Sequence, residues 1–145
     1  MIPDEPVRGR SQPHWFRALS GIERVRAFSR SLVPSPPMVH LLGHRATHVA
    51  AGTATFVMPA SDGCISPNGQ LQIVPAAIVA LEGASLTALP GGMDVVPMRF
   101  TFKAFRPAWP GKGNIVARAR VVNDSQLFVL AEVQVEDPDG RYLGQ

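Results

Sequence analysis

Cysteine is almost absent from this sequence: Cys64 is the only one in 145 residues. A single thiol excludes an intrachain disulfide framework and makes a reducing compartment the expectation. Charge is scarce as well, at 17% of residues against roughly 25% in an ordinary soluble domain. Because 46% of residues are hydrophobic, disorder is excluded for most of the chain, since disordered segments combine high charge with little apolar surface.

Long apolar runs are also missing. No uncharged apolar run reaches the length of a membrane span, and the N-terminus carries no apolar signal core. We therefore expect a soluble, cytoplasmic protein without a membrane partner. The length fits one domain, or one half of a tandem two-domain protein.

Lysine and arginine are absent from residues 49–98, whereas residues 1–48 hold seven arginines and the net charge is +3. This uneven distribution suits an anionic ligand such as a nucleotide phosphate. The basic residues are not interleaved with aromatic residues in a nucleic-acid-binding motif, so we expect no nucleic-acid partner. A solvated, arginine-rich face is the alternative interpretation.

The first part of the chain has helical periodicity. Apolar residues recur at helical spacing from His14 to Leu32, which predicts one amphipathic surface helix that ends at the prolines of residues 33–37. A short second helix is expected through Leu42, with Gly43 as its stop.

The rest of the chain alternates as strands do, with one exception. Residues 73–89 are apolar on every side apart from Glu82, with Pro75 suited to a first helical turn, which predicts a buried helix over about Val74–Leu89. Period-two alternation predicts five strands of an antiparallel sheet around that helix, over residues 52–58, 98–104, 115–121, 127–135 and 141–145.

Four motifs then suggest a family: Leu42-Gly43, Gly52–Thr55, Ser66–Gly69 and, most specifically, Phe105–Gly111. From about Pro37 to its end the chain resembles the PaaI-like hotdog acyl-CoA thioesterases. The resemblance implies an α+β hotdog fold, with an antiparallel sheet of about five strands wrapped around one long buried helix. It divides the chain into an N-terminal extension with an extra helix, residues 1–36, and a hotdog domain, residues 37–145.

The resemblance also implies an activity and an assembly. Such proteins hydrolyse acyl-CoA or related thioesters at the interface of a homodimer or a higher hotdog oligomer. No cofactor and no metal are implied. A hotdog sheet alone leaves an edge strand and half a site exposed, which independently favours a dimer.

The chain departs from the family at the helix start. The family usually has an Asn, then His-Gly-Gly, then an acid nine residues after that His. An alignment without gaps places Ser66 at the Asn and Gln72-Ile73-Val74 at His-Gly-Gly. Leu81 then falls at the acid position, and Glu82 lies one residue beyond it.

These positions define the candidate site. Glu82 is the candidate general base, because a desolvated carboxylate has a raised pKa and can activate water. A structural carboxylate at a subunit interface is the alternative. Backbone N–H groups at the helix start, including that of Val74, and the Gln72 side chain are candidate oxyanion donors. The candidate substrate-binding residues are Ser66, Gly69, Arg106 and Lys112. The resemblance implies that the last two bind coenzyme A phosphates, and a solvated turn is the alternative for them.

Other interpretations stay open. A non-catalytic hotdog module that binds acyl groups or a partner domain would explain the missing His-Gly-Gly. A hotdog hydratase would be expected to show a His–acid pair, and no histidine follows His48. His40, His44 and His48 are spaced four apart, but Gly43 interrupts a common helix and no acid or cysteine nearby completes a metal site. Cys64 is expected to be a small buried residue.

Overall fold

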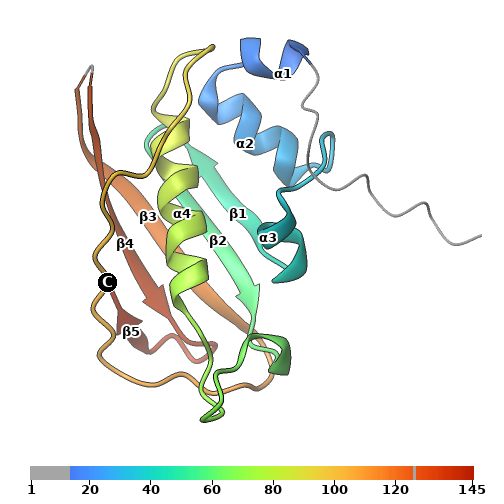
Figure 1. Ribbon diagram of the computed structural model, residues 1–145, viewed down its shortest axis with the longest axis vertical. Helices are drawn as coiled ribbons and strands as arrows, with labels where there is room; N and C mark the ends of the chain where they lie inside the picture. Colours follow the sequence, from blue (N-terminus) through green and yellow to red (C-terminus); the bar gives the residue numbers. More distant parts are fainter. Residues whose placement is uncertain (1–13, 126) are drawn as a thin grey trace, which may run out of the picture.

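The protein folds as one antiparallel sheet with a long helix packed against one face (Figure 1). The computed structural model describes residues 14–125 and 127–145. The strands follow their sequence order across the sheet, β1-β2-β3-β4-β5, and every neighbouring pair is antiparallel. The helices are α1 (His14–Ala18), α2 (Gly21–Ser29), α3 (Pro37–Leu41) and α4 (Val74–Thr87), and the strands are β1 (Arg45–Ala50), β2 (Thr53–Pro59), β3 (Asn114–Asp124), β4 (Val129–Glu136) and β5 (Tyr142–Gly144).

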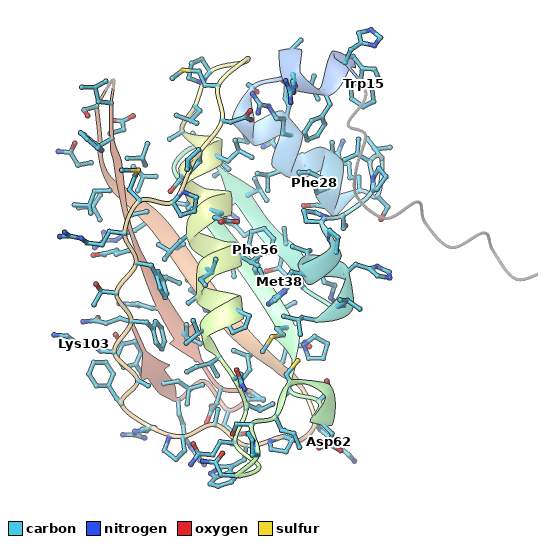
Figure 2. The ribbon with its side chains drawn as sticks, in the orientation of Figure 1. Trp15, Phe28, Met38, Phe56, Asp62 and Lys103 are labelled. Atoms are coloured by element: carbon cyan, nitrogen blue, oxygen red, sulfur yellow. The ribbon has the colours of Figure 1, made fainter. Side chains whose placement is uncertain are left out.

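The core lies between the sheet and α4. Alternate residues of the central strands point at the helix and are buried, as a period of two requires. On the helix, small side chains allow a close approach: a Cβ on Gly83 would lie 2.6 Å from Cε2 of Phe56 on β2. Figure 2 shows Phe56 beside α4. The buried core residues of β2, β3 and β4 are Ala54, Phe56, Met58, Ile115, Ala117, Ala119, Val133 and Val135.

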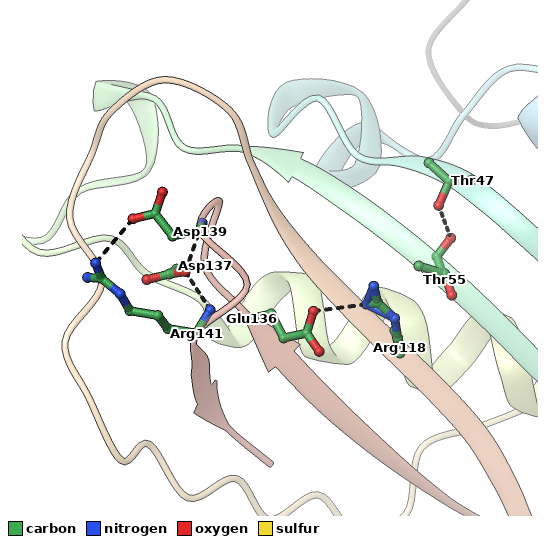
Figure 3. Close-up of polar contacts among 7 residues, drawn as sticks. All are labelled: Thr47, Thr55, Arg118, Glu136, Asp137, Asp139 and Arg141. Atoms are coloured by element: carbon green, nitrogen blue, oxygen red, sulfur yellow. Dashed lines mark hydrogen bonds and ion pairs between the residues drawn. The ribbon is translucent and has the colours of Figure 1, made fainter.

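The face of the sheet opposite α4 is polar. Arg118 Nη1 lies 3.1 Å from Glu136 Oε2, and Arg120 Nη2 lies 2.5 Å from Glu132 Oε1, so β3 and β4 carry a row of exposed ion pairs (Figure 3 shows the first). Such a face remains solvated. The candidate site is therefore expected on the helix side or at an end of the sheet.

The N-terminal helix differs from the sequence prediction, because it is broken into α1 and α2. The first helix ends at Ala18, and Ser20 caps the second: its hydroxyl accepts the N–H of Glu23, and the Glu23 carboxylate accepts the N–H of Ser20 at 2.9 Å. The sequence pattern of this capping box is Ser-x-x-Glu. The prediction of one helix over residues 14–32 was wrong at this point.

The helices α1 and α2 are held at the C-terminal end of α4. Gly21 donates its N–H to the carbonyl of Leu89 at 3.1 Å. Arg24, only 2% exposed, donates to Asp94 Oδ1 at 2.7 Å and to the carbonyl of Leu19 at 3.1 Å. The N-terminal segment thus packs against the C-terminal end of α4 and its following loop, away from the start of that helix.

The long helix and a sheet of five strands are confirmed, but one predicted strand does not form and another segment supplies the fifth strand. Residues 98–104 are extended but unpaired, apart from an isolated bridge between Ala104 and Gly144, so the predicted strand is wrong. Its neighbour β5 has three residues, and the two segments are joined by the backbone bonds between Lys103 and Gln145 and by the bond from Phe105 to Leu143. The fifth strand is instead β1, which the sequence pattern missed because a bulge between Ala46 and His48 breaks its alternation.

The long helix spans Val74–Thr87, as predicted, but it is not buried on all sides. The side turned away from the sheet carries Val74, 39% exposed, and Glu82, also exposed, with Ile78 and Leu81 partly buried between them. Among the described residues, no helix has both the length and the apolar character needed to cross a membrane.

Candidate active site

A cleft of about 590 Å³ lies at the N-terminus of α4. One wall is the loop that precedes the helix, with Ser66, Asn68 and Gln70. Gln72, Ile73 and Val74 form the helix start, and Phe102 with Ala104 of the extended segment closes the opposite side. The structure thus brings together Ser66, Gln72 and Val74, which the sequence alignment selected.

Hydrogen bonds within the chain shape this loop. Ser66 donates its N–H to the carbonyl of Gln70 at 2.8 Å and accepts the N–H of Gly69 on its own carbonyl, also at 2.8 Å. Its hydroxyl donates to Asn68 Oδ1. Gly69 has φ +81°, a conformation that glycine adopts without strain. Ser66 and Gly69 therefore hold the shape of the loop.

Two further bonds seat the loop on the rest of the fold. Gln72 donates its N–H to the carbonyl of Cys64, and Leu71 donates its N–H to the carbonyl of Ala108, both at 2.8 Å. Cys64 is buried beneath the loop, as expected. The Gln72 side chain is exposed and lines the cleft. The loop thus presents a carboxamide beside the helix start.

The helix start offers free hydrogen-bond donors. Among the described residues, the N–H groups of Ile73 and Val74 donate to no backbone carbonyl, and α4 has no side-chain cap. Pro75 occupies the first turn, which contains no acidic side chain. The positive end of the helix dipole and these two N–H groups therefore border the cleft, and no acidic side chain of the first turn neutralises them.

Glu82 does not line this cleft. It lies eight residues further along α4 than Val74, which at 1.5 Å per residue corresponds to about 12 Å. Its side chain is exposed in the single chain, contrary to the expectation of burial, because it lies on the side of α4 that faces away from the sheet. Partial desolvation by its apolar surroundings nevertheless raises the pKa of Glu82 above its ordinary value of 4.5. Leu81 lines a second, smaller cavity instead.

Arg106 and Lys112 are exposed and do not line the cleft. They flank residues 107–111, and the bond from Leu71 to Ala108 ties this segment to the back of the cleft loop. The two cations therefore flank a segment that is hydrogen-bonded to the cleft loop.

The sequence analysis missed Asn68, Gln70 and Phe102. Asn68 and Gln70 belong to the Ser66–Gly69 loop region, and its turn residues were the available signal. Phe102 was expected within a sheet strand. Its segment runs alongside α4 without forming a strand, and Phe102 lines the cleft together with Ala104 (Figure 1).

The three spaced histidines do not form a common site. His40 lies exposed on α3, His48 lies exposed on β1, and His44 is buried between these elements. Across residues 14–125 and 127–145, no group of three or more metal-ligating side chains gathers in one place.

Solved structures of other proteins have a similar fold. A phenylacetic acid degradation-related protein of Ralstonia eutropha JMP134 superposes with a TM-score of 0.74 at 20% identity, over 83% of this chain and 92% of its own. The PaaI protein of E. coli gives 0.73 at 15% identity, over 87% and 89% of the two chains. A Haemophilus influenzae thioesterase gives 0.72 at 19% identity, over 83% of each chain.

This chain has the hotdog fold. Its structural neighbours include a protein named PaaI and proteins named as thioesterases. No protein-family model matches its sequence, and no curated protein matches it either.

Proposed function

We propose that the protein hydrolyses acyl-CoA or related thioesters in the cleft at the start of α4. The observation that carries this proposal is the pair of free N–H groups, of Ile73 and Val74, at a helix N-terminus that borders a cleft. Hydrolysis of a thioester passes through an oxyanion, and preorganised N–H donors stabilise that charge. Gln72 adds a carboxamide donor from the same edge.

The fold supports the same reaction class. Hotdog neighbours are named as thioesterases, among them the protein from Haemophilus influenzae. A thioester is also compatible with the cleft walls, which combine the apolar side chains of Val74 and Phe102 with the polar loop. The acyl group packs against the apolar side, and the carbonyl lies at the helix start.

Arg106 and Lys112 are proposed to bind the phosphates of coenzyme A. Both are exposed cations beside the cleft loop, and guanidinium and ammonium groups bind phosphate through charge-assisted hydrogen bonds. Ser66 and Gly69 act indirectly, by holding the loop that forms the near wall.

Glu82 is proposed as the general base, acting across a dimer interface. It lies about 12 Å from the start of its own helix, beyond the reach of a carbonyl held there. A second subunit placed against the exposed side of α4 would bring this carboxylate to the partner's cleft. A raised pKa suits a base that takes a proton from water.

The extended segment beside the cleft supplies the surface for that dimer. Val96 is 74% exposed, Met98 is 81% exposed and Phe100 is 38% exposed, and the same segment continues into the cleft wall at Phe102. Apolar side chains with this degree of exposure, on an extended segment that has no strand partner among the described residues, favour association. We propose a homodimer in which this segment and the open side of α4 are covered by the second copy.

A non-catalytic acyl-binding module is the second candidate. It is favoured by Ile73 and Val74 themselves, whose side chains stand where glycines would let a thioester approach more closely. In that case acyl-CoA would bind in the cleft and no thiol would be released.

The test is thiol release from short-chain, long-chain and aromatic acyl-CoAs. We expect turnover of at least one class by the wild type, and loss of it in Val74→Asp, because the new carboxylate places negative charge where the oxyanion forms. Leu41→Asp is the matched control, since Leu41 is 70% exposed on α3. Binding of all classes without thiol release would replace hydrolysis by the binding module.

A further inference from the structure

One large aromatic side chain near the cleft is left in solvent. Trp109 is 58% exposed, and among the described residues its indole stacks on no other aromatic ring. It lies in the segment of residues 107–111, between the exposed cations Arg106 and Lys112. We call Arg106, Trp109 and Lys112 the Trp109 cluster. Figure 1 shows this segment crossing the lower end of the molecule, past the loop that precedes α4.

The backbone on both sides of the indole is held by the rest of the fold. Ala108 is buried, and its carbonyl accepts the N–H of Leu71, a cleft residue, at 2.8 Å. Gly111 donates its N–H to the carbonyl of Ala60, also at 2.8 Å. A backbone fixed on each side therefore keeps the Trp109 side chain at the surface.

The Trp109 cluster lies beside the cleft. Ala104 lines the cleft, and Arg106 follows it by two residues, which is at most about 7 Å along the chain. Trp109 directly follows Ala108, which a single hydrogen bond joins to the cleft residue Leu71. A ligand whose reacting end occupies the cleft can therefore place another part of itself on this segment.

Neighbouring acids do not neutralise the cations of the cluster. Neither Arg106 nor Lys112 forms an ion pair within the described part of the chain. The acidic turn of residues 137–139 is the neighbour of Lys112, because a Cβ on Gly113 would lie 2.8 Å from the proline of that turn. Its two carboxylates are already engaged, one by backbone N–H groups and one by Arg141 at 3.5 Å (Figure 3). Both cations thus keep their charge for an anionic ligand.

We propose that the Trp109 cluster binds the nucleotide end of coenzyme A, with the adenine stacked on Trp109 and the phosphates on Arg106 and Lys112. An aromatic face between two cations matches a nucleotide, which joins a flat base to phosphate groups. A phosphate without a base would use only the cations. The exposed indole is the feature that selects a nucleotide as the ligand.

This inference rests on the proposed thioester hydrolysis and narrows its substrate class. The thiol that leaves is coenzyme A itself. An acyl group can also be carried by the phosphopantetheine arm of a carrier protein, but that arm has no base to stack on Trp109. The nucleotide is remote from the reacting carbonyl, so its contacts contribute to substrate binding more than to the chemical step.

Fluorescence tests the nucleotide site without any turnover. Trp15 is the only other tryptophan, so in Trp15→Phe all indole fluorescence comes from Trp109. We expect saturable quenching of this variant by adenosine 3′,5′-bisphosphate and none by pyrophosphate, which has no base. Trp109→Phe, which leaves Trp15 as the sole indole, should show no quenching by either probe. Absence of quenching in Trp15→Phe would overturn the proposal.

Two thioesters of the same acyl group, one of coenzyme A and one of pantetheine, test the site during turnover. The wild type should have a KM for the coenzyme A thioester lower by about tenfold or more, the scale of one stacked base with its phosphates. Trp109→Ala should lose most of this preference through KM, and Trp109→Phe should retain most of it. Trp15→Ala, the matched deletion on α1, should keep the full preference. Equal KM values for both thioesters in the wild type would contradict the proposal.

The nucleotide site and the hydrolysis fail separately. If no thioester releases thiol, hydrolysis is wrong, and the quenching experiment alone decides whether the nucleotide binds. If thiol is released but adenosine 3′,5′-bisphosphate quenches nothing, the nucleotide site is wrong and hydrolysis stands. Faster turnover of the same acyl group on a carrier protein than on coenzyme A would assign the two cations to that protein and overturn the proposal.

Discussion

At the scale of single residues, His44 is the least satisfied polar group in the fold. It is only 7% exposed, and neither ring nitrogen has a hydrogen-bond partner among the described residues. Burial lowers the pKa of His44 to about 4, from 6.5. The imidazole is therefore neutral in the folded chain under conditions in which the unfolded chain would begin to bind a proton.

This makes folding stability depend on pH. Between pH 6.5 and about 4 the unfolded chain takes up a proton at His44 and the folded chain does not, so stability falls as pH falls. The full effect is roughly 3 kcal/mol in the free energy of unfolding. Urea unfolding near pH 7 and pH 5 should show about 2 kcal/mol of this loss for the wild type, because pH 5 lies between the two pKa values.

His44→Leu should remove most of that pH dependence and raise stability at neutral pH by about 1–2 kcal/mol, because no unpaired polar group remains buried. The exposed His48→Leu is the control and should change neither quantity. An unaltered pH dependence in His44→Leu would assign the titration to other groups.

Residue positions in the site followed the sequence only in part. The alignment selected Ser66, Gln72 and Val74, and the structure brings these three residues to one cleft, because a loop followed directly by a helix fixes their relative positions. The apolar run of residues 73–89 predicted a helix buried on all sides, whereas Glu82 is exposed in the single chain. An apolar run cannot show that one side of α4 remains uncovered in a single chain.

At the scale of elements, the contact between α4 and β2 determines how closely the helix sits on the sheet. Gly83 faces Phe56 with no room for a Cβ at the backbone positions found. In an exposed helix, Gly→Ala would stabilise by up to about 1 kcal/mol. Here Gly83→Ala should instead destabilise by about 1–3 kcal/mol through overpacking.

Thermal unfolding of Gly83→Ala measures this directly. The double variant with Phe56→Leu should recover part of the loss, since the smaller side chain gives the new methyl space. Stabilisation by Gly83→Ala alone would show that the helix is not held at this distance.

The helices and strands differ in how well the sequence pattern predicts them. The long helix and the strands with clean alternation, β2, β3 and β4, were predictable because their buried side chains repeat at a fixed period. β1 was not, because its bulge breaks the period. Residues 98–104 alternate as a strand does, but alternation within a segment does not show whether a neighbouring strand pairs with it.

At the scale of the whole molecule, the exposed apolar segment predicts self-association. Met98→Glu places a charge on the proposed dimer surface and should shift light scattering from dimer to monomer at micromolar concentration. Leu127→Glu, at an 85% exposed position in the β3–β4 hairpin, is the control and should leave the dimer intact. A wild-type monomer under these conditions would contradict the dimer, and with it a base that acts across the interface.

The central claim is that Glu82 activates water against a thioester, and one rate comparison tests it most directly. Thiol release by the wild type should rise with pH through a pKa above 4.5. Glu82→Gln, nearly isosteric, should keep the fold and lose turnover by a factor on the order of 10² to 10⁴. Asp62→Asn is the control and should retain the wild-type rate, because Asp62 is an exposed acid that does not line the cleft. Unchanged turnover in Glu82→Gln beside an active wild type would contradict the account.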